Sequence, residues 1–327
     1  MFQRILVPLD GSPRAERALP VAIRIARASG GSILLLQVVS PPIDYGGGLA
    51  AGGLVTGEMI ESEIAEASRY LKTIVTTKIP VGIPTIIEVL YGSPAQDILA
   101  CSEAQEADLI IMCSHGRTGI TRWVMGSVAH RLVHQTPVPV LVLRDTGDVL
   151  ARPKGMLPFR IFVPLDGSQL AETALVPAAN LAAALAAPHR GSLHLGQVAK
   201  LSTTAVAGSF VNQFNENALE YDRRYLTKVA EQLQTTMKSL KLSISWSIAS
   251  ETNDEDVAAT LREMAEYGER GKEIEGEGGG DGDLIAISTH GRGGLERWVM
   301  GSVTERLLNT TKLPMLIVPP QKVKQQA

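Results

Sequence analysis

One stretch of this chain is written twice, which limits it to folds built from two similar units. Residues 4–19 (RILVPLDGSPRAERAL) align with residues 160–175 (RIFVPLDGSQLAETAL), and residues 114–127 (SHGRTGITRWVMGS) align with 289–302 (THGRGGLERWVMGS). A chain of 327 residues also suits two domains. We therefore expect one domain over residues 1–147, a linker over 148–158, a second domain over 159–320 and a tail over 321–327.

The second copy is longer than the first between its matching ends. The first alignment is offset by 156 residues and the second by 175, so the second copy carries 19 extra residues. Part of this insertion is the acidic, glycine-rich run ERGKEIEGEGGGDGD at 269–283. Such a composition predicts a solvated loop near 268–283.

Each copy alternates short apolar runs with helical patterns. The first copy has apolar runs at 4–9, 32–39, 85–90, 108–113 and 138–143, and helical patterns at 12–29, 58–78, 94–105 and 121–134. The second copy has apolar runs at 160–165, 192–198, 242–248, 283–288 and 313–318. Apolar strands separated by helices indicate a parallel sheet covered on both faces. The predicted fold class is α/β, with two tandem doubly wound domains that each hold a five-stranded parallel sheet.

Composition excludes several classes of protein. The net charge of −3 and the aromatic content of 4% argue against a nucleic-acid partner. The most apolar helical pattern, at 174–188, contains Pro177 and is too short to span a bilayer. The chain opens with a strand-like run rather than a signal peptide, and Cys101 and Cys113 suit a reducing compartment. We expect a cytoplasmic protein with no membrane partner.

Two repeated PLDGS segments follow the first strand of each copy. Ligands of doubly wound sheets bind beyond the carboxyl ends of the strands, so Asp10 and Asp166 are expected to face that crevice. An aspartate or serine at such a turn can also be an ordinary helix N-cap. Taken alone, these segments favour the capping role.

A second repeated segment follows the fourth strand and reaches the same edge. Gly116 and Gly126 have no side chain to keep a polyphosphate from the backbone, and Ser127 adds a hydroxyl near the start of a helix, where anions bind favourably. The glycines alone would also suit tight turns. Two copies with identical spacing, each paired with a PLDGS turn, favour phosphate binding.

The combination of V-P-x-D-x-S after strand one with H-G-x(9)-G-S after strand four resembles the universal stress protein family. The resemblance covers nearly the whole chain, as two copies. It implies the strand order 3-2-1-4-5, as in adenine-nucleotide alpha-hydrolase-like folds. In the ATP-binding branch, the fingerprint G-x2-G-x9-G-[ST] holds ribose and phosphates, while the Asp after strand one and a backbone position at the end of strand two hold the nucleoside.

The resemblance implies one set of nucleotide-binding residues in each domain. In the first domain these are Pro8, Asp10, Val38, Cys113, His115, Gly116, Arg117, Gly126, Ser127 and Val128. In the second they are Pro164, Asp166, Val198, Ser288, His290, Gly291, Arg292, Gly301, Ser302, Val303 and Thr304. Cys113 and Ser288 stand where the fingerprint has its first glycine, and Ala129 stands where the second domain has Thr304. We therefore expect nucleotide affinity to differ between the domains.

These features predict an adenine-nucleotide-binding stress-response protein that takes ATP with Mg²⁺, the metal being held largely by phosphate and water. One alternative is a protein-interaction member of the family with vestigial pockets, and another is a slow ATPase. No base-activated nucleophile or Walker lysine is readable, so no catalytic residue is predicted.

Two further features concern metals and assembly. His130 and His134 are spaced i and i+4 on a predicted helix, but no third ligand is evident in the sequence, so no metal site is predicted. The last strand of each copy, within 138–144 and 313–320, would be an edge strand. In the family that the chain resembles, single domains dimerise through this strand, which implies internal pairing of the two domains here and a further homodimer.

Overall fold

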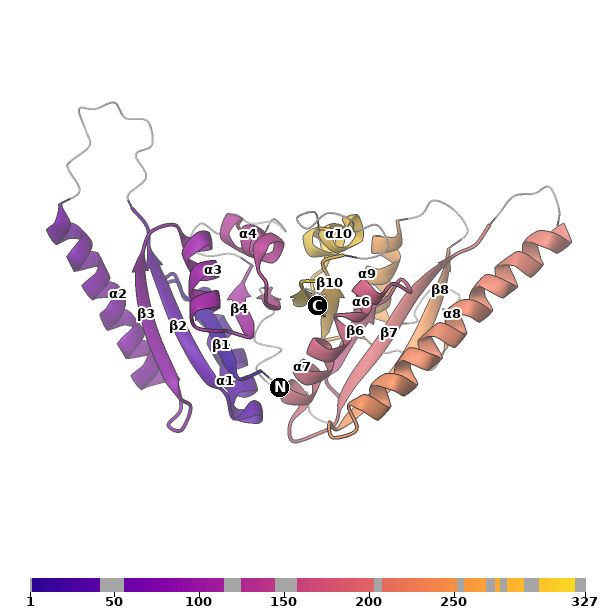
Figure 1. Ribbon diagram of the computed structural model, residues 1–327, viewed down its shortest axis with the longest axis horizontal. Helices are drawn as coiled ribbons and strands as arrows, with labels where there is room; N and C mark the ends of the chain where they lie inside the picture. Colours follow the sequence, from indigo (N-terminus) through magenta and orange to yellow (C-terminus); the bar gives the residue numbers. More distant parts are fainter. Residues whose placement is uncertain are drawn as a thin grey trace, which may run out of the picture.

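The computed structural model describes residues 2–41, 56–114, 125–144, 158–202, 208–251, 256–268, 274–276, 281–290 and 300–320. The two halves of the chain lie side by side as two α/β units (Figure 1). Among the described helices, none is both long and apolar enough to cross a membrane.

The first domain follows the predicted alternation of strands and helices. Its elements are β1 (Arg4–Pro8), the 3₁₀ turn η1 (Ala15–Arg17), α1 (Ala18–Ser29), β2 (Ser32–Val39), α2 (Gly57–Lys78), β3 (Thr85–Tyr91), α3 (Pro94–Ala104), β4 (Leu109–Cys113), α4 (Ser127–Gln135) and β5 (Val140–Leu143).

The second domain repeats this order with longer elements in its middle. Its elements are β6 (Arg160–Pro164), α6 (Gln169–Glu172), α7 (Leu175–Ala186), β7 (Gly191–Lys200), α8 (Gly208–Thr236), β8 (Leu242–Glu251), α9 (Val257–Tyr267), β9 (Ile274–Gly276), β10 (Leu284–Ser288), α10 (Ser302–Thr310) and β11 (Met315–Val318).

Local capping chemistry sets several helix ends. The Thr56 side chain accepts a hydrogen bond from the Met59 amide at the start of α2, and Gly30 ends α1 in a left-handed conformation (φ 67°). The helix α4 begins at Ser127, and the residue before it, Gly126, is its extended N-cap. The first part of the helix predicted from Thr121, residues 121–124, lies outside the described residues.

Each domain has the predicted strand order. The parallel strands run β3-β2-β1-β4-β5 in the first domain and β8-β7-β6-β10-β11 in the second, which is the order 3-2-1-4-5 twice. The fold class expected from the sequence is therefore confirmed.

The last strands of the two domains pair with each other. β5 and β11 are antiparallel, with Leu141 opposite Leu316, and they join the two sheets into one sheet of eleven strands. The Arg144 guanidinium also donates to the carbonyl of Leu308, across the same join. Neither last strand is an edge strand in this arrangement, so its backbone groups are satisfied by the other domain.

The acidic insertion is not entirely a loop, which corrects the expectation from its composition. Ile274–Gly276 form β9, which pairs antiparallel with Ser247 to Ala249 of β8. β8 would otherwise expose unpaired backbone groups at the outer edge of the sheet, and a short antiparallel strand satisfies some of them. Among the described residues, the second domain therefore has the five predicted parallel strands and one added antiparallel strand.

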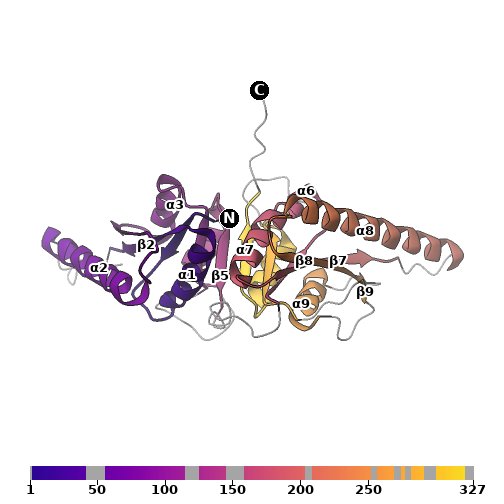
Figure 2. The same ribbon diagram turned by 90° about the horizontal axis from the view of Figure 1, so that it is seen from below.

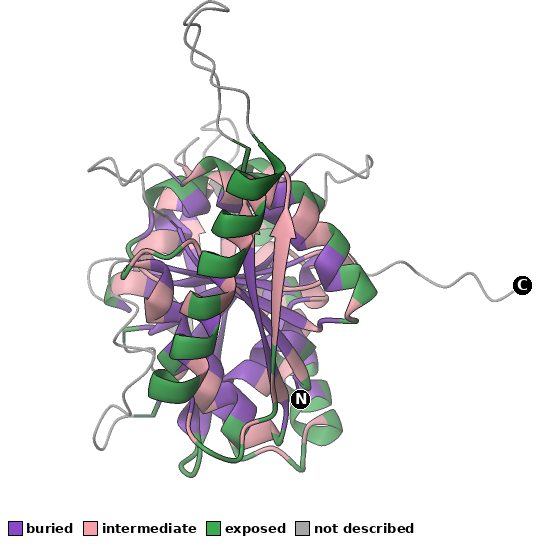
Figure 3. Cartoon of the chain, turned by 90° about the vertical axis from the view of Figure 1, so that its left-hand side faces the viewer, coloured by how far each residue is buried: buried purple, intermediate pink, exposed green. Residues whose placement is uncertain are grey.

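The core forms two layers, one on each face of the sheet. One buried cluster contains Ile25 of α1, Leu71 of α2, Leu181 of α7 and Leu226 of α8, and the other contains helix residues of α3, α4, α9 and α10. Both clusters run through both domains, and α1 contacts α7 directly near the join (Figure 2). Figure 3 shows the exposed outer face of α2 in front of the buried strands.

Candidate functional site

The two PLDGS turns have the same geometry in both domains. One carboxylate oxygen of Asp10 accepts hydrogen bonds from the amide (2.9 Å) and hydroxyl (2.6 Å) of Ser12. Asp166 makes the same pair of contacts with Ser168, at 3.0 and 2.6 Å. Between each pair stands a glycine with a φ of 81°, a conformation that side chains disfavour.

The serine of each turn accepts a hydrogen bond from an amide at the start of the following helical segment. The Ser168 hydroxyl accepts from the Ala171 amide at 3.1 Å and is the N-cap of α6, and the Ser12 hydroxyl accepts from the Ala15 amide at 3.2 Å. The capping alternative therefore holds for Ser168, whereas Ser12 makes the same kind of bond without being the N-cap of η1 or α1. The aspartates fix the turn through one oxygen, at the carboxyl end of the first strand of each domain.

The glycine that precedes α4 or α10 brings the chain back to the end of the fourth strand. The Gly126 amide donates to the Ser114 carbonyl and the Gly301 amide to the Thr289 carbonyl, each at 2.8 Å. Both glycines are extended N-caps, with φ values of −61° and −60° that any residue adopts. A tight turn therefore does not explain why these two positions are glycine. Without a side chain at these positions, the start of each helix stays accessible.

A cavity of about 1400 Å³ lies at this edge of the second domain. It brings together every second-domain residue from the fingerprint that the structure describes. These are Pro164, Asp166, Val198, Ser288, His290, Gly301, Ser302, Val303 and Thr304. They come from β6, β7, β10 and α10, so four separated segments converge on one space.

Two hydroxyl-bearing residues that line the cavity have partners within the protein. The Thr304 hydroxyl donates to the Ser288 carbonyl at 2.9 Å, which ties the first turn of α10 to the end of β10. The Ser288 hydroxyl lies 3.3 Å from the Thr173 hydroxyl. Thr304 is buried, and its expected phosphate contact competes with this internal bond.

The first domain places its counterparts at the equivalent edge. Pro8 ends β1, Val38 lies in β2, Cys113 ends β4, and Ser127 and Val128 begin α4. The Cys113 thiol donates to the Arg14 carbonyl at 2.9 Å, so the side chain that replaces the fingerprint glycine is directed toward the segment before α1. His115, Gly116, Arg117, Gly291 and Arg292 lie outside the described residues.

Several cavity residues were missed by the sequence analysis. The helix α8 contributes Phe214, Asn217, Tyr221 and Asp222, and the end of β7 contributes Lys200. Phe214 and Tyr221 are 64% and 66% exposed although they line the cavity. No motif marks these positions, because their place at the cavity depends on how far α8 extends over the sheet.

One missed residue does have a sequence signal. Gln197 lines the cavity with only 3% of its surface exposed, and its side-chain oxygen has no hydrogen-bond donor among the described residues. The side-chain oxygen of Gln37 in the first domain is likewise buried without a hydrogen-bond donor among the described residues. Both glutamines precede the valine at the end of the second strand, so the repeat itself points to them.

Comparisons with known proteins point to one family. The model of the universal stress protein family matches the chain twice, over residues 1–144 and 159–319. A universal stress protein of Methanocaldococcus jannaschii is 33% identical over 148 residues, which cover 44% of this chain and 83% of the relative. One from Thermus aquaticus is 31% identical over 145 residues, which cover 44% of this chain and 100% of the relative.

A solved structure resembles the whole chain. The crystal structure of a universal stress protein from Archaeoglobus fulgidus covers 97% of this chain and 96% of its own, with a TM-score of 0.56 and 18% identity. That identity supports the fold alone. The double match of the family model decides the question: the chain belongs to the universal stress protein family.

Proposed function

We propose that this protein binds an adenine nucleotide, ATP with Mg²⁺, at the carboxyl edge of its sheet and acts as a regulatory stress-response protein. The observation that carries the proposal is the second-domain cavity, which gathers nine residues of the nucleotide fingerprint around about 1400 Å³. Pockets for small ligands have volumes of about 300–1000 Å³, so the space is ample for a nucleoside triphosphate.

The phosphates are assigned to the start of α10. The first intrahelical hydrogen bond runs from the Glu305 amide to the Gly301 carbonyl, so the amides of residues 302–304 precede the helical ladder. Such amides and the helix dipole favour an anion, and the Ser302 hydroxyl adds a further donor. Lys200 supplies a positive charge from the end of β7. Mg²⁺ would be held mainly by phosphate and water.

The nucleoside is assigned to the side of the cavity formed by β6, β7 and α8. Asp166 and the backbone of Val198 lie there, as the family resemblance implies. The side-chain oxygen of Gln197 is a buried acceptor that lacks a donor among the described residues, and a nucleoside amino or hydroxyl group would supply one. Phe214 and Tyr221 offer apolar surface in the same cavity.

We extend the proposal to the first domain with a different affinity. Its turn at Asp10 and its helix start at Gly126 match those of the second domain. It differs at Cys113 and at Ala129, which replaces the Thr304 hydroxyl. We expect both domains to bind ATP without hydrolysing it at an enzymatic rate. Any ATP hydrolysis should be slower than the usual enzyme range of about 1–10³ per second.

The alternative is a protein-interaction member with vestigial pockets. It rests on the loss of the first fingerprint glycine in both domains. The side chains at those positions have internal partners: the Cys113 thiol bonds to the Arg14 carbonyl, and the Ser288 hydroxyl lies beside Thr173. These contacts give the polar atom of each side chain a partner within the protein, which favours retained binding.

Two measurements test the proposal. The purified protein is denatured, and the released small molecules are identified by mass spectrometry. Protein freed of ligand is then titrated with ATP–Mg in a calorimeter. Two bound nucleotides per chain would support both sites, and one per chain would support a single site. The absence of nucleotide together with no binding at millimolar ATP would favour the protein-interaction alternative.

A further inference from the structure

The helices α4 and α10 lie side by side where the two domains join (Figure 1). They are equivalent helices of the two repeats, and both begin with Ser-Val after a glycine. His130 is the fourth residue of α4 and Glu305 is the fourth residue of α10. The strands β5 and β11 pair about Leu141 and Leu316, which are also equivalent positions of the repeat. The side chains of His130 and Glu305 therefore face each other across the join.

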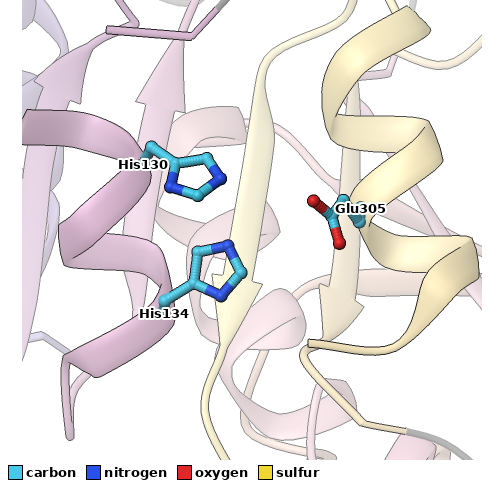
Figure 4. A group of neighbouring side chains, drawn as sticks. All are labelled: His130, His134 and Glu305. Atoms are coloured by element: carbon cyan, nitrogen blue, oxygen red, sulfur yellow. The ribbon is translucent and has the colours of Figure 1, made fainter. Parts of the chain in front are cut away.

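A second histidine completes a cluster at this place. His134 follows His130 by four residues, so both rings lie on one face of α4, with their centroids 4.4 Å apart. Figure 4 shows both rings directed toward Glu305 of the facing helix. One ring nitrogen of each histidine and one carboxylate oxygen of Glu305 all lie within 4.8 Å of one another.

One nitrogen atom of the cluster is buried without a hydrogen-bond partner among the described residues. It is the Nε2 atom of His134. A buried polar atom without a partner raises the free energy of the folded state. Burial and the nearby His130 lower the pKa of His134, and together they outweigh the opposite effect of Glu305.

We propose that His130, His134 and Glu305 bind one Zn²⁺ ion that links the two domains. Two imidazoles and a carboxylate are a typical ligand set for zinc, with water in the fourth position. Tetrahedral ligands about 2.1 Å from the metal lie about 3.4 Å apart, so small side-chain rotations bring the present atoms into range. Magnesium and calcium prefer oxygen ligands and do not suit two imidazoles.

The site is expected once per chain. The residue of α10 that corresponds to His134 is Asn309, so the two repeats do not build two such sites. His130 and Glu305 are exposed and His134 is half-buried, which leaves a path for the metal and room for a bound water. The proposal does not depend on nucleotide binding, because none of the three residues lines the described cavity.

The test is a titration of the full chain, freed of metal by a chelator, with Co²⁺ as a visible probe for the zinc site. We expect saturable binding of one Co²⁺ per chain, with the absorption of a nitrogen- and oxygen-bound ion. We expect one equivalent of Zn²⁺, but not millimolar Mg²⁺, to displace it. The absence of saturable binding by the wild-type chain would overturn the proposal.

Single replacements test each ligand. His130→Ala, His134→Ala and Glu305→Ala should each abolish the saturable binding, and alanine at these helical positions preserves the helices. His189→Ala, which removes an exposed histidine outside the cluster, is the matched control and should bind as the wild type does. Retained stoichiometric binding by Glu305→Ala would contradict a link between the domains. Zn²⁺ should also raise the melting temperature of the wild type but not that of Glu305→Ala.

Discussion

Leu141 of β5 and Leu316 of β11 lie opposite each other in the strand pair that joins the two domains. They are also equivalent positions of the repeat, because each follows its Gly-Ser pair by the same number of residues. The two flanking pairs are equivalent to each other: Val140 lies opposite Ile317, and Met315, which corresponds to Val140, lies opposite Val142, which corresponds to Ile317. A local two-fold axis therefore passes between Leu141 and Leu316, and equivalent surfaces of the two domains meet across it.

The burial of both leucines in this strand pair predicts the effect of shortening either side chain on stability. Both leucines are fully buried, so Leu141→Ala and Leu316→Ala should each lower the free energy of unfolding by about 2–5 kcal/mol. The double variant should depart from additivity, because the two residues face each other across one strand pair. Urea unfolding followed by circular dichroism measures all three. A loss below about 0.5 kcal/mol in either single variant, as for typical surface substitutions, would mean that these side chains are not buried in solution as they are in the structure.

The glycines before α4 and α10 predict a separable effect on the two nucleotide sites. Gly301→Asp should abolish binding in the second domain and Gly126→Asp in the first, because a carboxylate would repel phosphate at the helix start. The backbone tolerates a side chain there, since φ is about −60° and a Cβ at 301 first meets the Thr289 carbonyl at 3.4 Å. Calorimetric stoichiometry with ATP–Mg measures the loss. Gly301→Ala is the control for folding, and an unchanged stoichiometry in both aspartate variants would refute the assignment.

Much of the fold could be predicted because its signals are local. The apolar runs that become β1 and β6 are repeated almost letter for letter, and the turns at Asp10 and Asp166 fold identically in both domains. A repeated segment at the same strand end implies a shared edge. The cavity accordingly gathered every described second-domain residue that the fingerprint indicated.

What could not be predicted depends on contacts between distant segments. The short strand at Ile274–Gly276 exists because β8 has an open edge, and the composition of the insertion does not reveal this. The place of Phe214 and Tyr221 at the cavity depends on the length and direction of α8. Glu305 approaches His134 only because β5 pairs with β11, so the sequence alone gave no third ligand to the two histidines.

The buried side-chain oxygen of Gln197 predicts that replacing this residue changes stability and ATP affinity in opposite directions. Gln197→Leu should raise the free energy of unfolding of the nucleotide-free protein by about 1 kcal/mol, because a buried acceptor without a partner is replaced by an apolar group. The same change should weaken ATP binding in the second domain. Thermal unfolding and calorimetry measure the two effects. Gln37→Leu is the matched variant of the first domain, and a variant Gln197→Leu that keeps full ATP affinity would remove this glutamine from the site.

The surroundings of the two cysteine thiols predict that they react slowly with thiol reagents in the folded protein. Burial, and then the hydrogen bond and charge of Glu88, raise the pKa of the Cys101 thiol to about 12, so the reactive thiolate is scarce at neutral pH. The Cys113 thiol is buried and bonded to the Arg14 carbonyl. Neither of the two cysteines should react with a disulfide reagent at pH 7 until the protein is unfolded, when both should react. Rapid reaction of one thiol in the native protein would instead favour a redox-sensing role for Cys113.

The buried His194 predicts a specific loss of stability in mild acid. Its ring lies between the hydroxyls of Ser245 and Ser247, each at 2.8 Å. Burial, and then the charge of Arg160, lower its pKa from 6.5 to about 4. Between these values the unfolded chain binds a proton that the folded protein does not, so stability falls as the pH drops from about 6.5 toward 4.

The expected contribution of this one group is about 3 kcal/mol across that pH window. His194→Gln keeps a polar side chain between the serines but cannot take up the proton, so its stability should depend less steeply on pH between 6.5 and 4. Urea unfolding at intervals across this range measures the slope. The exposed His189 provides the control, because His189→Gln should leave the slope unchanged. Equal slopes for the wild type and His194→Gln would mean that His194 is protonated in the folded protein at an ordinary pH, against the burial that the structure gives it.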